Sequence, residues 1–247
     1  MLTRVGRSRL ALIGVLAVLL VAPLAATAAG DVNGSGKFWK FHHTPVKVEF
    51  GDNLSNSWER YFKKALDQWN GSNVVQGKSV HGSTNPAQCK PKDGTVQVCD
   101  GNYGQNTGWL GLTTLSFNGD IIKSATTQIN DSFFDDGQLP YKNSKQAKQH
   151  TMCHELGHAF GLDHVNYKSC MNPDDNAVFH DTKPSHRDFK TLDNIYSKKN
   201  ESKAAAAETG PSGTLALPQA ALAAHETVTT QRQPDGTTTV TYIEWAP

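Results

Sequence analysis

The stretch of sequence that decides the fold is Thr151–His164, which reads Thr-Met-Cys-His-Glu-Leu-Gly-His-Ala-Phe-Gly-Leu-Asp-His. Most of it lies in a predicted helix over residues 144–160, where His154 and His158 are four residues apart. Side chains at that spacing project from one face of a helix, so the two imidazoles can bind the same zinc ion. Glu155 adjoins the first histidine and can act as general base toward a water on that ion.

The residues that follow predict a third ligand. Gly161 permits the left-handed turn that ends a helix, and the returning chain brings His164 toward the two helical histidines. Three protein ligands leave one position open, as in catalytic zinc sites. Zinc then activates a water and polarises a scissile carbonyl, while Glu155 takes a proton and passes it to the leaving amine. The stretch therefore predicts zinc-dependent hydrolysis of peptide bonds; a core helix with incidental histidines is the alternative.

The run His154–His164, followed by Ser169-Cys170-Met171-Asn172-Pro173, resembles the metzincin clan of zinc endopeptidases with its Met-turn, and within that clan matrixin-like enzymes. The resemblance extends over residues 38–197 and is strong over 150–173. It implies an α+β catalytic domain with a twisted mixed sheet, an active-site helix and a C-terminal helix. Residues 109–117 would be an antiparallel edge strand that pairs with extended substrate. Met171 would form an apolar floor beneath the histidines.

The sequence also departs from that family. Residues 82–149 contain no histidine, so the second, structural zinc site of vertebrate matrixins is not expected. The leader at 30–37 is too short for a latency domain and has no cysteine, so inhibition by a cysteine-bearing prosegment is not expected either. Calcium is a further candidate cofactor through Asp131, Asp135 and Asp136, although a solvated acidic loop is the simpler interpretation.

Composition and the N-terminus indicate an exported protein. Residues 1–29 combine three arginines, an apolar run over 10–21 and small residues at 26–28, the pattern of a secretory signal peptide. The run is too short for a spanning helix, so we expect an extracellular protein without a stable membrane anchor. The net charge of +1 includes those three arginines, and the chain has no basic stripe interleaved with aromatics. Nucleic acid is therefore not an expected partner.

Four cysteines in an exported chain indicate two disulfides, and sequence alone allows three connectivities. If the Met-turn implied by the resemblance lies under the zinc helix, Cys153 approaches Cys170. Cys89 would then pair with Cys99. A cysteine ligand to zinc is the alternative.

Composition divides the chain after the signal peptide into a leader (30–37), a catalytic domain (38–200), a low-complexity linker (201–225) and a C-terminal extension (226–247). Two Thr- and Val-rich runs in the extension predict a β-hairpin that could pack on the domain, bind a partner or move freely.

We expect His150 to be exposed or to cap a helix. Residues 78–108 have the composition of a loop, and the other predicted elements are strands at 44–50, 109–117 and 121–129 and helices from Ser55 or Asn56 to Trp69 and at 185–197.

These patterns predict a secreted zinc endopeptidase that acts on proteins or peptides. One alternative keeps the chemistry and acts on cell-wall peptides. The other is a secreted binding protein that uses the C-terminal hairpin and has a vestigial metal site, although the intact Glu155 argues against it. The sequence does not indicate an oligomeric state.

Overall fold

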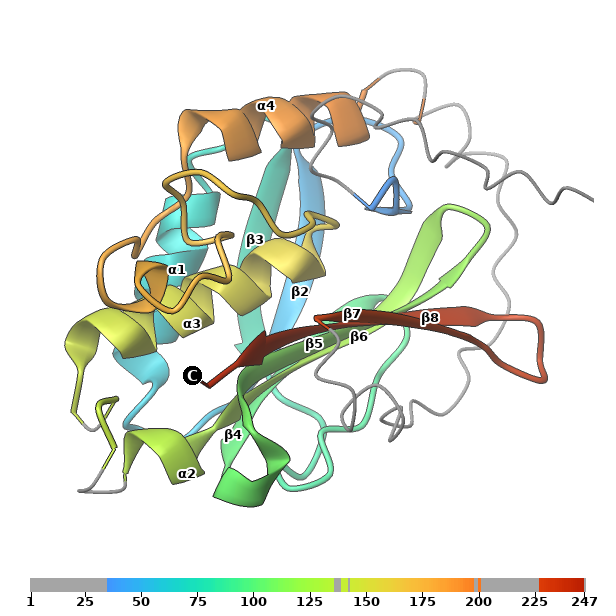
Figure 1. Ribbon diagram of the computed structural model, residues 1–247. Coiled ribbons are helices and arrows are strands. Elements are labelled where there is room, and N and C mark those ends of the chain that lie inside the picture. The colour runs from blue at the N-terminus through green and yellow to red at the C-terminus, as the bar shows by residue number, and fades with distance from the viewer. Residues whose placement is uncertain (1–34, 136–138, 142, 198–199, 201–226, 247) are drawn as a thin grey trace, which may run out of the picture. The chain divides into compact units, whose positions relative to one another are not determined.

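A mixed sheet is the centre of the described structure (Figure 1). The computed structural model describes residues 35–135, 139–141, 143–197, 200 and 227–246, all within one compact unit, Val32–Pro247. The strands are β1 (Phe38–Trp39), β2 (Val46–Asn53), β3 (Val75–His81), β4 (Thr95–Gly101), β5 (Trp109–Asn118), β6 (Ile121–Asn130), β7 (Val228–Arg232) and β8 (Thr238–Trp245).

The sheet has a parallel half and an antiparallel half. Its order is β3-β2-β4-β6-β5-β8-β7, with β1 paired to β6. Strands β3, β2, β4 and β6 are parallel, whereas β5 is antiparallel to both β6 and β8. Parallel and antiparallel pairing in one sheet, with helices packed on it, confirms the predicted α+β class with a mixed sheet.

The helices are α1 (Glu59–Trp69), α2 (Asp131–Phe134), α3 (Lys145–Ala159) and α4 (His186–Ile195), with 3₁₀ turns at Gln105–Thr107 and Ala177–Phe179. The helices α1 and α3 lie across the same face of the sheet (Figure 1). The aromatic stripe of α1 is buried as predicted, and the Trp69 indole N–H donates to the Cys153 carbonyl of α3 at 2.9 Å. No helix in the described ranges is long and apolar enough to cross a membrane.

Helix α1 begins later than the sequence predicts. Its first residue is Glu59, and the preceding Trp58 offers no side-chain cap. Ser55, a predicted cap, is engaged elsewhere, because its amide and hydroxyl each donate to the Asp100 carboxylate at 2.6 Å. A contact between distant segments therefore overrides the local capping signal.

The prediction that residues 78–108 form a loop is wrong in part, since β3 continues to His81 and β4 lies within this range. Strand β4 is paired between β2 and β6, and Thr95–Asp100 are all buried. Its polar Gln97 is accommodated by hydrogen bonds from Asn53 and Ser83. Thr95–Val98 alternates polar and apolar residues, but the loop-like composition of the surrounding residues hid this short strand pattern.

The predicted edge strand at 109–117 is not an edge. Its outer side is paired along its length with β8, in register from Trp109 opposite Trp245 to Phe117 opposite Thr238. The C-terminal hairpin therefore packs on the domain, beside β5 and beneath α3 in Figure 1. Hydrogen bonding along an open strand edge accounts for this pairing.

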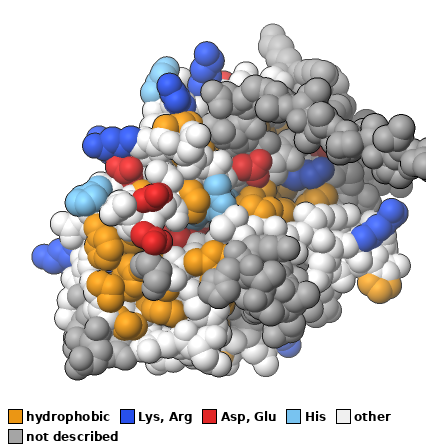
Figure 2. Space-filling model, in the orientation of Figure 1, with side chains coloured by type: hydrophobic (Ala, Val, Ile, Leu, Met, Phe, Trp, Pro, Cys, Tyr) orange, Lys and Arg blue, Asp and Glu red, His pale blue; other side chains and the backbone are white. Residues whose placement is uncertain are grey.

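Charged side chains on the visible surface are dispersed. On the face drawn in Figure 2, Lys and Arg side chains lie singly around the outline, whereas hydrophobic side chains gather in one area at the lower left. Among the coloured residues of this face, basic groups therefore form no continuous stripe.

Candidate metal centre

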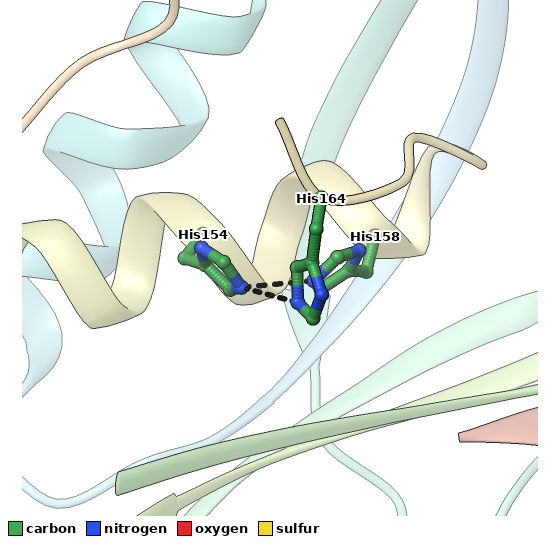
Figure 3. Close-up of side chains that lie close together, drawn as sticks. All are labelled: His154, His158 and His164. Atoms are coloured by element: carbon green, nitrogen blue, oxygen red, sulfur yellow. Dashed lines mark hydrogen bonds between the residues drawn. The ribbon is translucent and has the colours of Figure 1, made fainter. Parts of the chain in front are cut away.

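Two of the predicted ligands come from helix α3. The Ser144 hydroxyl caps its first turn by accepting from the Ala147 amide. From Ala147 onward every residue of the helix is buried, and the side chains of both His154 and His158 are inaccessible to solvent. Figure 3 shows the two imidazoles projecting from the same side of α3, with His164 approaching from the loop that follows.

The turn after α3 brings in the third histidine. Gly161 has φ 94°, its amide donates to the His158 carbonyl at 2.8 Å, and the Leu162 amide donates to the Gly157 carbonyl at 3.2 Å. These two bonds form a Schellman motif, which requires a left-handed residue after the helix. A Cβ at position 161 would also overlap the Lys37 carbonyl oxygen. Glycine is therefore required both for the turn and for the close approach.

Three imidazole nitrogens converge on one point. His154 Nε2 is 2.9 Å from His158 Nε2 and 3.1 Å from His164 Nε2, the contacts dashed in Figure 3. The other ring nitrogens of His154 and His158 lie 2.7 and 2.8 Å from the carbonyls of Cys170 and Leu162. A carbonyl can only accept, so each Nδ1 carries the proton and each Nε2 presents a bare lone pair.

This arrangement fits a metal ion. Two lone pairs facing each other repel unless a cation lies between them. Two nitrogens bound to one tetrahedral zinc are about 3.3 Å apart, close to the separations seen. Hydrogen bonds from the far ring nitrogen to a carbonyl are also the usual second shell of zinc-bound histidine.

Burial sets the protonation of the three histidines. It lowers the pKa of His154 and His158 well below the usual range, and it lowers the pKa of His164 to about 4. The imidazoles are thus neutral at pH 7, the state in which histidine binds a metal.

Met171 lies directly against α3. It is fully buried in a turn closed by a bond from the Asn172 amide to the Ser169 carbonyl at 3.1 Å. A Cβ at Gly157, between the two helical histidines, would overlap Met171 Sδ and lie 2.6 Å from the Trp69 ring. The glycine thus permits the thioether to pack beneath the helix at the level of the ligands, as an apolar contact.

All four cysteines form disulfides, with the pairings that the metzincin resemblance implies. Cys153–Cys170 joins α3 to the Met171 turn, with Cα atoms 5.9 Å apart, and Cys89–Cys99 closes the connection between β3 and β4. Because each sulfur is in a disulfide, a cysteine ligand to zinc is excluded.

Glu155 lies between α3 and β5. Its Oε2 accepts a hydrogen bond from the Thr113 hydroxyl at 2.6 Å, whereas its Oε1 has no hydrogen-bond partner. A Cβ at Gly111 would overlap Oε1, so the strand can cross the carboxyl only with glycine there. Burial raises the pKa of Glu155 well above its usual range; the nearby Glu244 carboxylate adds to this, and the Thr113 bond opposes it.

The expectation for His150 is wrong. Its side chain is fully buried, with Nδ1 2.6 Å from the Asp181 carbonyl and Nε2 3.0 Å from Glu244 Oε1. The available signal was its position one turn before His154 on the same helix. Burial comes from β8, which the sequence did not assign to this face of the sheet.

Two residues of β8 reach the centre without a sequence signal. The Tyr242 ring stacks on His158, with centroids 4.1 Å apart and planes 8° apart, and its hydroxyl donates to Asp163 at 2.6 Å. The Glu244 carboxylate is fully buried, and it forms a second group of potential metal ligands with His150 and His154.

The acidic residues considered for calcium have other partners. Asp131 accepts a hydrogen bond from the Trp58 indole, and Asp135 lies 3.9 Å from the Lys148 ammonium. Asp136 lies outside the described residues, as do the predicted signal peptide and linker. The two groups of potential ligands found among the described residues both contain His154, and neither contains these acids.

Comparison with known proteins gives structural similarity only. No family model and no curated protein sequence matches the chain. The structure is similar to high choriolytic enzyme 1, a hatching-enzyme zinc protease of the medaka fish Oryzias latipes, with 13% identity, 66% of this chain and 95% of that chain covered, and a TM-score of 0.36. It is also similar to archaemetzincin from Archaeoglobus fulgidus, with 12% identity, 59% and 99% covered, and a TM-score of 0.36. Neither similarity assigns a role to a residue of this chain.

Proposed function

We propose that this chain is a secreted zinc-dependent endopeptidase in which His154, His158 and His164 hold one zinc ion and Glu155 is the general base. The observation that carries the proposal is the convergence of bare imidazole lone pairs beside a buried carboxyl that has one oxygen free. Three neutral ligands with a fourth position open form a catalytic rather than a structural zinc site.

The protein groups have separate tasks. When bound, zinc supplies Lewis-acid chemistry: it polarises a carbonyl oxygen and acidifies water. The Thr113 hydroxyl fixes Glu155 Oε2 and leaves Oε1 available to accept a proton and return it to the leaving amine. Burial raises the pKa of Glu155, which favours its return of a proton to the leaving amine.

Secretion is part of the proposal and depends on the signal-peptide pattern of residues 1–29. The two disulfides fit an oxidising compartment. Expression with residues 1–29 in an exporting host, followed by N-terminal sequencing, should give a soluble protein that begins near residue 30. Retention of residues 1–29 in a membrane fraction would contradict secretion.

The test of activity compares the chain with Glu155→Ala and Glu155→Gln on an unstructured protein such as casein, with and without a chelator. Loss of a general base should lower the rate by about 10² to 10⁴, while zinc content stays unchanged. Because β8 covers the centre, each Glu155 variant is also compared with its parent in protein that carries Glu244→Gln. If zinc is bound and the Glu155 variants match their parents in every pair, the proposal fails.

The two alternatives predict different outcomes. Cleavage confined to peptidoglycan peptides would indicate a cell-wall enzyme with the same chemistry. A binding protein with a vestigial site would bind zinc and cleave nothing in any background. The pairing of the C-terminal hairpin with β5 is not what a hairpin exposed for a partner would show.

A further inference from the structure

Strand β8 lies where an extended peptide would lie beside β5. It runs antiparallel to β5, and its main chain pairs with it from Trp109 to Phe117. An open strand edge beside a catalytic centre binds extended peptides by this kind of pairing. In this structure the chain's own C-terminal strand therefore uses the hydrogen bonds that a substrate would need.

The side chains of β8 alternate between the two faces of the sheet. Ile243 packs with Trp109 and Leu112 on the face away from α3. Its neighbours Tyr242 and Glu244 point to the other face, where Tyr242 stacks on His158 and Glu244 approaches His150 and His154. On this face the opposing residues of β5 are Thr113 and Gly111, which contact the general base.

Together these contacts close the metal centre. His154, Glu155 and His158 have no solvent exposure, and neither has Glu244. Tyr242 lies flat on His158, and of the three histidines only His164 keeps partial exposure. An extended peptide could pair with this side of β5 only after β8 leaves it.

The Glu244 carboxylate is the second observation that points to the metal. Its Oε1 is 3.0 Å from His150 Nε2, at ion-pair distance, so the carboxylate is paired on one side. One of its oxygens lies within 4.8 Å of a ring nitrogen of His154. A fully buried carboxylate is costly unless cations compensate it, and a metal at His154 would be a second cation beside His150.

We propose that the C-terminal hairpin is a built-in occupant of the substrate site and that Glu244 is a fourth ligand to the metal held by His154, His158 and His164. The full chain is then latent, and displacement of β8 opens both the pairing edge of β5 and the fourth coordination position. The latency rests on the proposed peptidase function, whereas the ligand assignment does not. His150 acts as a positioning residue that holds Glu244.

The ligand assignment is tested with cobalt(II) in place of zinc. Glu244→Gln keeps the size of the side chain and removes its charge, so the visible absorption spectrum of the cobalt protein should change and the metal affinity should fall by about tenfold or more. Thr241→Val is the matched control on the same strand: its hydroxyl contacts Thr114, and the spectrum should stay as in the parent chain. An unchanged spectrum in Glu244→Gln, or an equal change in both variants, would overturn the assignment.

Latency is tested with a reversible covalent lock. The hydroxyls of Thr114 and Thr241 are 3.0 Å apart on paired strands, so Thr114→Cys combined with Thr241→Cys can link β8 to β5. The lock is made in the Glu244→Gln background, where loss of the proposed ligand loosens β8. The oxidised protein should be inactive, and mild reduction should raise its casein cleavage at least tenfold, whereas Glu244→Gln without the lock should not change under the same treatment. Equal activity of the oxidised and reduced forms would overturn latency.

The two proposals fail in different ways. The peptidase function fails, and latency fails with it, if no form of the protein cleaves any substrate while zinc is bound. These forms include the reduced double-cysteine protein and Glu244→Gln. The cobalt spectrum still decides whether Glu244 is a ligand. If Glu244→Gln and the parent chain cleave casein equally while the cobalt spectra differ, the peptidase function and the ligand stand and latency is overturned.

Discussion

The two sides of the metal centre are built in different ways. On one side, α3 and its return loop supply three histidines and a glutamate within eleven residues, His154–His164. On the other, β8 supplies Tyr242 and Glu244 from far along the chain, and Tyr242 is 79 positions away from its partner Asp163. Helical spacing and a glycine turn determine the first side locally, whereas strand pairing with β5 brings in the second. In the proposed enzyme the first side would carry the chemistry, and the second would control access to it.

The largest expected effect is on the helix side. His158→Ala removes one of three ligands, so zinc affinity should fall by more than about 100-fold, since even outer-shell losses cost tenfold to 100-fold. Competition with a chromogenic chelator measures this. His186→Ala, at the exposed start of α4, is the control and should bind zinc as the parent does. Equal affinity in the two variants would mean that the helix side does not hold the metal.

The next largest effect is expected from removing the disulfides, because both should stabilise the fold and only one should affect metal binding. Replacing Cys153 and Cys170 by serine opens a loop of 17 residues, and replacing Cys89 and Cys99 opens one of 10 residues, so each pair should cost about 3 kcal/mol in the free energy of unfolding. Urea unfolding measures both. Zinc affinity should fall in the first pair only, because the Cys170 carbonyl orients His154. A similar loss of affinity in both would contradict this role of the Met171 turn.

A smaller effect is expected on the strand side. Tyr242→Phe keeps the ring on His158 and removes the hydroxyl bond to the half-buried Asp163, at a cost of about 2 kcal/mol. Amide hydrogen exchange over Thr238–Trp245 should become faster. Tyr196→Phe is the control: it loses a buried hydroxyl bond to the Phe160 carbonyl, and exchange in β8 should not change. Faster exchange in both variants would show that β8 has no anchor of its own at Asp163.

The smallest expected effect concerns a carboxyl outside both sides. Burial raises the pKa of Asp131 to about 7; Asp100 adds to this, and the Trp58 indole bond opposes it. Between pH 4 and 7 the folded chain keeps a proton that the unfolded chain releases, so the free energy of unfolding contributed here falls as pH rises, by at most about 1.4 kcal/mol per pH unit.

Asp131→Asn should flatten this slope in urea unfolding of the zinc-free protein. Asp235→Asn serves as control, because the Thr237 hydrogen bonds lower the pKa of Asp235, and its contribution is lost as pH falls instead. A slope in Asp131→Asn equal to that of the parent would show that Asp131 ionises at its ordinary pH and that its burial does not raise its pKa.

Local patterns predicted those parts of the structure that neighbours in sequence control. The helix that ends at Trp69, the active-site helix, the Gly161 turn and the C-terminal hairpin each follow from the residues within one segment. Strand β4 was missed because the residues around it have a loop-like composition, although Thr95–Val98 alternates polar and apolar side chains. The burial of His150 was missed because another segment covers it.

The sequence by itself determined the chemistry: the spacing of His154, Glu155 and His158 is converted into geometry by the 3.6-residue helix turn, and Gly161 supplies the reversal that His164 needs. Tertiary structure alone decided that the edge of β5 is paired, that Tyr242 covers His158 and that Glu244 lies beside the ligands. The physical reason is that a strand edge offers the same hydrogen bonds to any extended segment. Which segment takes them depends on the packing of the whole chain and on no motif within it.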